Sequence, residues 1–436
     1  MLKRIRIRGY KSLHDVEVHL QPLTILFGPN AAGKSNFLDA LQLLSRMATS
    51  RTLKEAFDPP YRGKPLESFA FPEEGIRGLL NKDSARFSIE ADVKLSDAIV
   101  DSVNRQIREL RSSRPAEHSG GSASDPSSVR ERYLRYRVEV EILPKAGLLR
   151  VSDEYLAALS AGGEPSKKRK AFLEKMNEDR LHLRMERQAH PTFHELYLDH
   201  TIVSRPLYPP HYPHLVALRE ELANWFLFYF EPRERMRAPG PVKEVRHIGL
   251  MGEELASYLN TLKALDERQF HVVEKSLRMI IPSVTHIQVD VNDLGEVELR
   301  LVEGKTPVPA RVVSEGTLRT LGLLALGGAK QAPALVGFEE PENGIHPRRI
   351  RMVAELLKTQ AQTGSTQLMV TTHSPILPDY VPDPSLYVCG KRNGGTFIEP
   401  FRTWGPLGRR DDIADALDAE DAPAVSTRIL RGDFDA

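Results

Sequence analysis

The chain is poor in cysteine, in net charge and in long apolar runs, and each shortage excludes a class of protein. Cys389 is the one cysteine among 436 residues, so an intrachain disulfide and a metal site built on cysteine pairs are both excluded. The 60 basic residues balance the 59 acidic ones to a net charge of +1. Any contact with DNA therefore has to come from a local basic patch.

Two further shortages concern membranes and secretion. No apolar run approaches the roughly 18 residues that a membrane-spanning helix needs. The first eight residues alternate apolar and basic side chains, and they lack the apolar core of a signal peptide. We therefore expect a soluble, cytoplasmic protein with no membrane partner.

Strand and helix patterns alternate along the chain, which is typical of an α/β protein. Residues 2–9 and 16–20 alternate with period two and residues 23–27 are apolar, which predicts three strands; the apolar spacing after Lys34 predicts a helix. Residues 112–128 contain seven serines, two glycines and two prolines, which predicts a flexible loop. The further predicted elements are strands at 86–95, 132–143 and 181–187, a strand or helix at 225–230, helices at 252–262 and 270–279, and a hairpin of 285–291 with 297–302.

The strongest motif is residues 28–35, which fit the pattern G-x-x-x-x-G-K-[ST] at every position. Its glycines let backbone N–H groups turn toward the β-phosphate of a nucleotide, and the N-terminus of the following helix adds partial positive charge. Lys34 is expected to bridge the β- and γ-phosphates and Ser35 to bind Mg²⁺, so ATP and Mg²⁺ are the predicted ligands. The predicted nucleotide-binding residues of this loop are Gly28, Pro29, Asn30, Ala31, Ala32, Gly33, Lys34, Ser35 and Asn36.

Two weaker motifs are carboxylates and a histidine at predicted strand ends. An apolar strand pattern ends in Glu339 and Glu340, where the first carboxylate can hold the Mg²⁺ shell and the second can deprotonate the attacking water. A second apolar strand pattern ends at His373, which can contact a γ-phosphate. Taken singly, such a pair of glutamates usually indicates a solvated strand end, and a lone histidine at a strand end ordinarily has a structural role.

A third weak motif precedes an apolar helical run at residues 318–326. The segment can present free N–H groups and a helix dipole to an anion, or it can simply cap the helix. Its residues are Ser314, Glu315, Gly316 and Thr317.

The order of these motifs narrows the class of ATPase. The glycine-rich loop comes first, the segment at Ser314 second, the paired glutamates third and His373 last. ABC-type ATPases place their P-loop, signature, Walker B strand and switch histidine in this order. AAA+ and RecA-like motors have no signature between P-loop and Walker B.

The same segments resemble those of a known family, the SMC, RecF and OLD-type ABC ATPases. The similar segments are G-Y-K-S-L at 9–13, F-G-P-N-A-A-G-K-S-N at 27–36, S-E-G-T-L-R at 314–319, E-E-P-E-N-G-I-H-P at 339–347 and T-T-H-S-P at 371–375. The resemblance implies an ABC-type ATPase head, which is a P-loop mixed sheet with flanking helices and two lobes. The roles that it implies are catalysis for Lys34, Glu340 and His373, Mg²⁺ binding for Ser35 and Glu339, phosphate contact for Lys11, a D-loop at Asn343 and Gly344, and a signature at 314–317.

The resemblance also implies a division of the chain. Residues 1–95 would be the N-terminal part of the head with the P-loop, 96–241 an inserted α/β region with the flexible loop, and 242–436 the C-terminal part with the remaining motifs. Two departures stand out: Glu339 occupies a position where the family usually has aspartate, and no glutamine is recognisable as a Q-loop residue. Lys11 also fits an exposed lysine at a strand end.

In ATPases of this type, the signature of one head closes over the nucleotide of another. One P-loop and one signature per chain therefore imply a homodimer around two ATP molecules. We expect a Mg²⁺-dependent ATPase that drives or gates a DNA-associated process in DNA repair or anti-phage defence. OLD enzymes carry a Toprim nuclease after the switch histidine, but only residues 374–436 follow here, so a nuclease or effector is expected as a separate protein.

Two alternatives remain open at the level of the sequence. One is a nucleotide-dependent switch or scaffold with little turnover. The other is the ATP-binding subunit of an ABC transporter, which the motif order permits. The S-E-G-T signature, the opening with Lys11 and the missing Q-loop argue against the transporter.

Overall fold

The computed structural model describes residues 1–112, 128–160, 162–177, 180–186, 192–327, 332–403, 424–432 and 434. The predicted flexible loop at 112–128 lies outside the described residues except for its two ends. The chain forms two compact units, each assembled from separate stretches of sequence. The first unit consists of Met1–Leu20, Asn36–Trp225 and Lys391–Phe397, and the second of Gln21–Ser35, Phe226–Gly390 and Ile398–Ala436.

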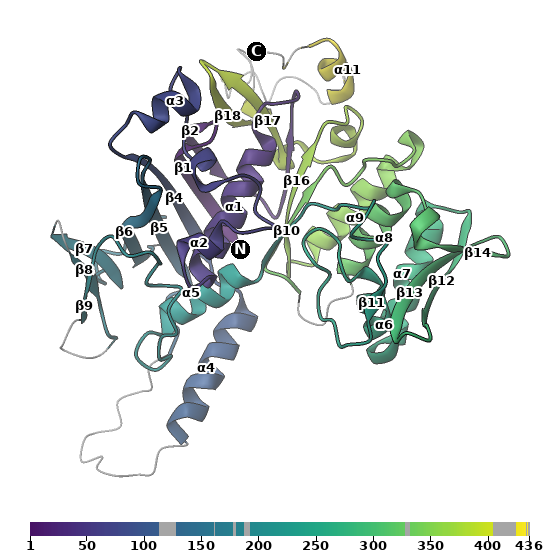
Figure 1. Ribbon diagram of the computed structural model, residues 1–436, viewed down its shortest axis with the longest axis horizontal. Coiled ribbons are helices and arrows are strands. Elements are labelled where there is room, and N and C mark those ends of the chain that lie inside the picture. The colour runs from purple at the N-terminus through teal and green to yellow at the C-terminus, as the bar shows by residue number, and fades with distance from the viewer. Residues whose placement is uncertain are drawn as a thin grey trace. The chain divides into compact units, whose positions relative to one another are not determined.

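The first unit is built on an eight-stranded antiparallel sheet (Figure 1). In spatial order its strands are β2 (Leu13–His19), β1 (Leu2–Tyr10), β4 (Ala85–Lys94), β5 (Tyr133–Leu143), β6 (Leu148–Ala158), β7 (Leu173–Asn177), β8 (Arg180–Leu183) and β9 (Thr192–Glu195). In β1, Ile5 and Ile7 are fully buried whereas Arg8 is exposed, as the period of two requires. The N-terminal strand predictions are confirmed, and residues of the 96–241 segment extend the same sheet.

Helix α1 (Lys34–Thr49) begins directly after the glycine-rich loop and lies mostly in the first unit. Its fully buried face confirms the predicted helical spacing and includes Phe37, Leu38, Leu41, Leu43 and Leu44. The other helical elements of this unit are α2 (Leu53–Ala56), η1 (Pro65–Ser68), α3 (Gly75–Leu80), α4 (Asp97–Ser112) and α5 (Pro213–Ala223).

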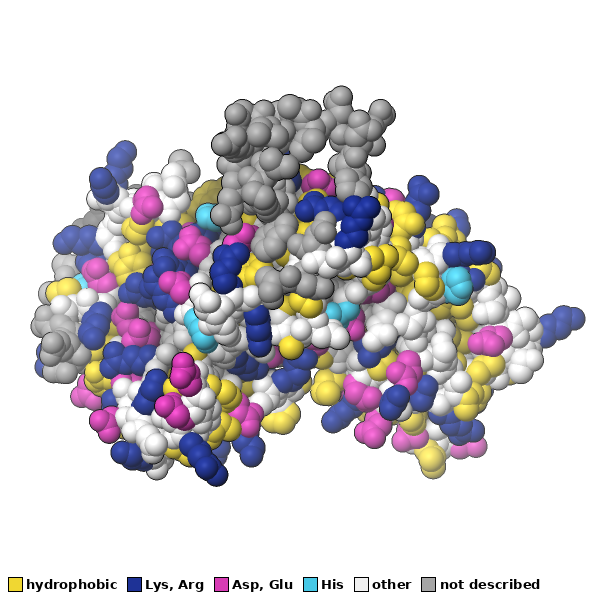
Figure 2. Space-filling model, turned by 90° about the horizontal axis from the view of Figure 1, so that it is seen from above, with side chains coloured by type: hydrophobic (Ala, Val, Ile, Leu, Met, Phe, Trp, Pro, Cys, Tyr) yellow, Lys and Arg dark blue, Asp and Glu magenta, His cyan; other side chains and the backbone are white. Residues whose placement is uncertain are grey.

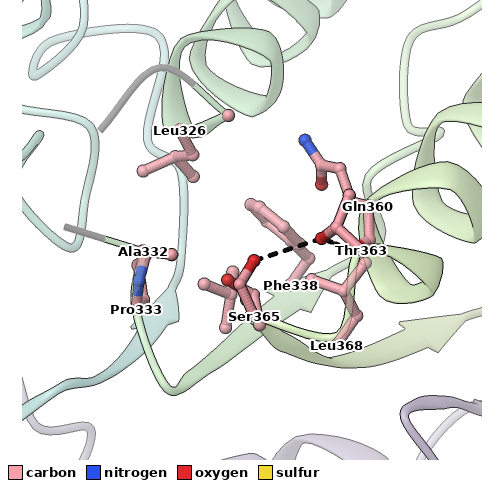
Figure 3. Close-up of a pocket in the computed structure, with 11 residues that line it drawn as sticks. Leu326, Ala332, Pro333, Phe338, Gln360, Thr363, Ser365 and Leu368 are labelled. Atoms are coloured by element: carbon pink, nitrogen blue, oxygen red, sulfur yellow. Dashed lines mark hydrogen bonds between the residues drawn. The ribbon is translucent and has the colours of Figure 1, made fainter. Parts of the chain in front are cut away.

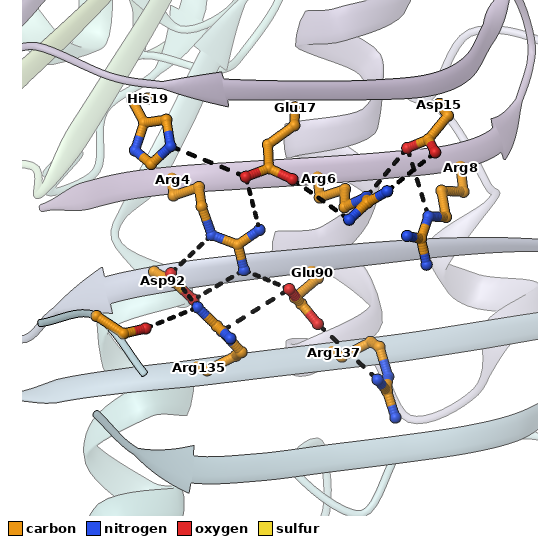
Figure 4. Close-up of polar contacts among 11 residues, drawn as sticks. Arg4, Arg6, Arg8, Asp15, Glu17, His19, Glu90, Asp92, Arg135 and Arg137 are labelled. Atoms are coloured by element: carbon orange, nitrogen blue, oxygen red, sulfur yellow. Dashed lines mark hydrogen bonds and ion pairs between the residues drawn. The ribbon is translucent and has the colours of Figure 1, made fainter. Parts of the chain in front are cut away.

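One face of this sheet carries rows of paired charges (Figure 4). Arg4 Nε lies 2.8 Å from Asp92 Oδ2, and Arg135 Nε lies 2.7 Å from Asp92 Oδ1. Arg6 forms a further pair, with 3.0 Å between its terminal nitrogen and Asp15 Oδ2. Figure 2 likewise shows Lys and Arg side chains interspersed with Asp and Glu on the face in view. Because carboxylates neutralise these arginines locally, they do not supply the basic patch that a DNA contact would need.

The second unit contains the central strands of a six-stranded sheet. The spatial order is β10 (Trp225–Phe228), β15 (Leu335–Glu339), β16 (Gln367–Thr372), β3 (Leu23–Phe27), β17 (Leu386–Arg392) and β18 (Gly395–Pro400). Neighbouring strands from β15 to β17 are parallel, so their carboxyl ends share one edge. The segment predicted as strand or helix at 225–230 forms a strand, and the predicted strand at 23–27 is confirmed.

A smaller sheet and several helices complete the second unit. The sheet is β11 (Gly240–Pro241), β13 (Glu296–Glu303) and β12 (Val284–Val291), with β14 (Thr306–Pro309) paired to β13. The helices are α6 (Leu255–Leu265), α7 (Glu267–Ile280), α8 (Glu315–Leu326), α9 (Ile350–Gln362) and α11 (Val425–Leu430), with short η2 (Ala310–Val312), η3 (Pro347–Arg349), η4 (Leu377–Tyr380), η5 (Asp383–Ser385) and η6 (Phe401–Thr403). The predicted hairpin and the α/β class are confirmed. Among the described helices, none combines the length and apolar character that crossing a bilayer requires.

Candidate active site

The candidate site lies at the carboxyl edge of the parallel strands in the second unit. Strand β16 lies between β15 and β3; its Thr371 pairs with Glu339 and its Thr372 with Phe27. The glycine-rich loop follows β3, the glutamates end β15, and the histidine follows β16. Parallel register therefore brings three distant segments to one edge, where α/β sheets commonly bind ligands. The side chains gathered there are Lys34, Ser35, Glu339, Glu340 and His373.

The loop between β3 and α1 contains three residues with positive φ. Gly28 has φ of 149°, Gly33 of 106° and Ala31 of 62°. A Cβ atom at Gly28 would lie 1.9 Å from the carbonyl oxygen of Cys389, so only glycine fits there. Because α1 begins at Lys34, the N–H groups of its first turn face the loop, as anion binding requires.

Lys34 folds back onto this loop and is only 3% exposed. Its Nζ donates to the carbonyl oxygens of Gly28 at 2.8 Å and Pro29 at 2.9 Å. Burial lowers the pKa of Lys34 to about 8, and the nearby carboxylates of Glu340 and Glu339 oppose that shift. The ammonium group is thus already surrounded by oxygen atoms.

His373 connects Lys34 to Glu340. Its Nδ1 lies 3.1 Å from Lys34 Nζ and its Nε2 lies 3.0 Å from Glu340 Oε1. Burial, and then the charge of Lys34, lower the pKa of His373. In the neutral imidazole that fits these partners, Nδ1 accepts from Lys34 and the Nε2 proton is donated to Glu340; this tautomer is assigned from the geometry.

The backbone at Glu340 is left-handed, with φ of 50°. Its N–H donates to Thr371 O at 2.9 Å, and its carbonyl accepts from Asn343 N–H at 3.0 Å. A non-glycine residue keeps such a conformation only where its surroundings fix it, and such residues cluster at active sites. The turn thus aims the Glu340 carboxylate at His373.

The Ser35 hydroxyl donates to a carboxylate oxygen of Glu339. A hydroxyl and a carboxylate are the hard oxygen ligands that Mg²⁺ uses in P-loop sites. The residues therefore fit Mg²⁺ together with nucleotide phosphates. The side chain of Glu339 is longer than that of the aspartate usual in the family, and it still reaches the Ser35 hydroxyl.

The lowered pKa of Lys34 predicts how nucleotide affinity depends on pH. Lys34 has to be charged to contact the phosphates, and in the protein without ATP it loses its charge as pH rises through about 8. We expect ATP affinity to weaken between pH 8 and 10 by up to about tenfold per unit. Between pH 8 and 10, Lys34 stays protonated in the unfolded chain but loses its proton in the folded protein. The free-energy cost of burying a charged Lys34 therefore falls as pH rises, so Lys34 destabilises the fold less. Binding of a fluorescent ATP analogue at several pH values checks this.

The matched control is Lys34→Arg, whose guanidinium stays charged over this range. Its affinity should stay level from pH 8 to 10, even if it is lower throughout. An equal loss of affinity in both proteins would contradict the assignment to Lys34.

The predicted signature caps and starts α8. The Ser314 hydroxyl accepts from Thr317 N–H at 3.2 Å, so the helix-cap interpretation holds for this side chain. A Cβ at Gly316 would lie 2.1 Å from the carbonyl oxygen of Gly344. Glu315 pairs with Arg233, with 2.7 Å between Oε1 and Nε. The signature and the predicted D-loop thus touch through two glycines of one chain.

Lys11 and Asn36 belong to the first unit. Lys11 Nζ lies 2.7 Å from Asp39 Oδ2 and donates to Arg62 O at 3.2 Å. Asn36 Nδ2 donates to Ser12 Oγ at 2.8 Å. Their predicted roles at the nucleotide stay predictions.

Two residues near the site were given no role by the sequence reasoning. Cys389 is buried beside the loop, where its thiol donates to Ala32 O at 3.6 Å, and burial raises its pKa to about 12. Glu342 is buried between the paired glutamates and the predicted D-loop. Glu342 lies inside the motif at 339–347, which could have marked it as a candidate. The spacing of residues in the sequence could not show its contacts.

A cavity of about 290 Å³ lies at the opposite, amino ends of β15 and β16 (Figure 3). Phe338, Leu326 and Gln360 are among its lining residues, and Thr363 Oγ1 lies 3.1 Å from Ser365 Oγ at its wall. None of the candidate catalytic residues lines it. The site is therefore defined by its side chains rather than by this cavity.

Parts of this sequence are similar to those of known proteins. A family model described as "AAA domain, putative AbiEii toxin, Type IV TA system" matches residues 23–379. An OLD nuclease of Thermus scotoductus is 43% identical over 44 residues, which cover 10% of this chain and 8% of that protein. A DNA replication and repair protein RecF of Crocosphaera subtropica is 42% identical over 55 residues, covering 12% of this chain and 14% of that protein. The chain thus spans less than a sixth of these relatives.

A solved structure of an SMC head bound to the C-winged helix domain of ScpA is also similar. It has a TM-score of 0.48 and 12% identity, and the match covers 91% of this chain and 97% of that chain. The family model and the sequence matches confirm the resemblance that the motifs predicted.

Proposed function

The chain belongs to the family described as "AAA domain, putative AbiEii toxin, Type IV TA system", and from this premise we propose that it is a Mg²⁺-dependent ATPase of the SMC/RecF/OLD type. One observation carries the proposal. Lys34 and His373 lie 339 residues apart in the chain and 3.1 Å apart in space, at the strand edge that also holds Ser35 and Glu340.

Each side chain at this edge has a chemical task in ATP hydrolysis. Lys34 and the loop N–H groups bind and orient the β- and γ-phosphates. Glu340, held by His373, accepts a proton from the attacking water. Ser35 and Glu339 would hold Mg²⁺, which when bound neutralises phosphate charge.

We further propose that the active form is a homodimer. Residues 314–317 would contact the nucleotide held by a second copy, because N–H groups at the start of α8 and the Ser314 hydroxyl suit a γ-phosphate. Asn343 and Gly344 would lie at the same interface. Hydrolysis would remove these contacts and let the two copies separate.

The biological process is proposed from the relatives. One sequence relative is named an OLD nuclease and the other a DNA replication and repair protein, which supports a DNA-associated role in repair or anti-phage defence for a cytoplasmic protein. A separately encoded nuclease or effector is the proposed partner. Residues 1–95 and 242–436 would form the head, with 96–241 as its insertion.

The test is ATP turnover per chain over a dilution series, with oligomeric state measured in parallel. We expect turnover per chain to fall as the dimer dissociates, and to respond to added duplex DNA. Turnover that stays constant down to the monomer would contradict the dimer mechanism. Tight ATP binding with negligible turnover at every concentration would instead support the nucleotide switch.

A further inference from the structure

Glu342 is a buried carboxylate close to the proposed catalytic residues, and the mechanism so far gives it no task. Glu342 is only 7% exposed. Oε1 accepts a hydrogen bond from the Thr372 hydroxyl, whereas Oε2 is buried without a hydrogen-bond partner among the described residues. The negative charge of Glu342 acts to raise the pKa of Lys34, so the carboxylate lies within electrostatic reach of the site.

Thr372 extends this contact to the backbone around His373. Its hydroxyl donates to Glu342 and accepts from Ser374 N–H at 2.9 Å. A hydroxyl that donates and accepts at once is held in one orientation. Because Thr372 and Ser374 flank His373, the Glu342 carboxylate fixes the strand end from which the imidazole projects.

The segment after β15, which begins at Glu340, also contacts the end of β16 at two other points. Glu340 N–H donates to Thr371 O at 2.9 Å, and Glu340 Oε1 lies 3.0 Å from His373 Nε2. The bond from Thr372 to Glu342 is the third attachment. Strand pairing fixes the backbone up to Thr372, and the Thr372–Glu342 bond is the attachment that links the end of this strand to the segment after Glu340.

A purely structural role does not account well for this carboxylate. Burial raises the pKa of Glu342, which means that the charged form is disfavoured there. The Thr372 hydroxyl and the backbone N–H groups of Glu342 itself and of Ser374 act to lower this pKa, but the effect of burial is larger. An apolar side chain of similar volume would pack without this penalty, so the hydrogen-bond acceptor at this position points to a task at the site.

We propose that Glu342 is a positioning residue, which through Thr372 holds His373 in contact with Glu340 and Lys34. The inference rests on the ATP hydrolysis proposed above. In this role Glu342 acts through His373 and does not itself contact the phosphates.

The test replaces Glu342 with leucine and Thr372 with valine, singly and together. Either change removes the link to the His373 backbone, so kcat should fall by about 10- to 100-fold while KM for ATP stays within about threefold. The double variant should lose no more than the stronger single one, because both break the same link. Glu342→Gln should recover most of the activity, since its amide oxygen can still accept from Thr372.

The matched control is Glu355→Leu, the same change at a half-exposed glutamate of α9, which should leave kcat unchanged. In a His373→Ala background, Glu342→Leu should cause no further loss; a full additional loss would overturn the proposal. Wild-type kcat in the Glu342→Leu variant would overturn it too.

A second readout does not depend on turnover. Amide hydrogen exchange over residues 370–376 should accelerate in Glu342→Leu and Thr372→Val but not in Glu355→Leu. If the wild-type protein hydrolyses no ATP, the proposed function fails, and unchanged exchange would still overturn the positioning role separately.

Discussion

Replacing Lys34 with alanine is expected to abolish measurable ATP turnover and to weaken ATP binding by about 100- to 1000-fold. The ammonium makes charge-assisted hydrogen bonds, each worth about 1.5–3 kcal/mol, and two phosphates would share it. Isothermal titration or fluorescence with an ATP analogue measures the binding, and phosphate release measures the turnover. Lys34 is 3% exposed and its Nζ is already held at the loop carbonyls, where the phosphates would bind, so alanine would remove the cation from the proposed site.

The matched control is Lys358→Ala, which removes a lysine on α9 that pairs with Glu355. That variant should bind and hydrolyse ATP as the wild type does. Thermal unfolding of both variants shows whether they fold. A folded Lys34→Ala protein with wild-type affinity would contradict the P-loop assignment.

The second large effect is expected for Glu340→Gln. The amide oxygen can still accept from His373 Nε2–H, so the site geometry is retained while the base is removed. Turnover should fall by about 100- to 10,000-fold, the usual contribution of a general base. ATP affinity should stay within a few-fold, and dimers should accumulate in ATP because hydrolysis no longer separates them.

Single-turnover kinetics and size measurement with and without ATP check both parts. Glu355→Gln is the control, since it makes the same change on an exposed part of the second unit. Rapid turnover in Glu340→Gln would exclude Glu340 as the base. Slow turnover without any accumulation of dimers would leave the base in place but contradict the dimer mechanism.

The sequence predicted the loop at residues 28–35 because its geometry is local. Positive φ at Gly28 and Gly33 and the start of a helix at Lys34 are properties of a short stretch, and residue types report them directly. The strands observed at Leu2–Tyr10 and Leu23–Phe27 were predicted at 2–9 and 23–27 for the same reason. Their alternation or apolar run reflects which face is buried.

The 96–241 segment was harder to interpret because its strands depend on partners. Strand β6 was not predicted: it carries Glu154 and Asp153 among apolar residues, and its pairing with β5 shifts register between Glu139 and Val140. A shift of one residue breaks the period of two that sequence patterns rely on. Glu154 is fully buried because the N–H groups of Ile202 and Val203 bind it, which no local pattern reports.

The amino-acid sequence by itself determined which residues form the proposed site: a glycine-rich loop, a pair of carboxylates and a histidine, in the order typical of one ATPase class. The tertiary structure decided their geometry, with Lys34, His373 and Glu340 in one chain of contacts and Glu342 holding the strand end behind them. The physical reason is that parallel strand register places residues more than 300 positions apart side by side. Local sequence fixes a turn, whereas only the packed sheet fixes which strand ends meet.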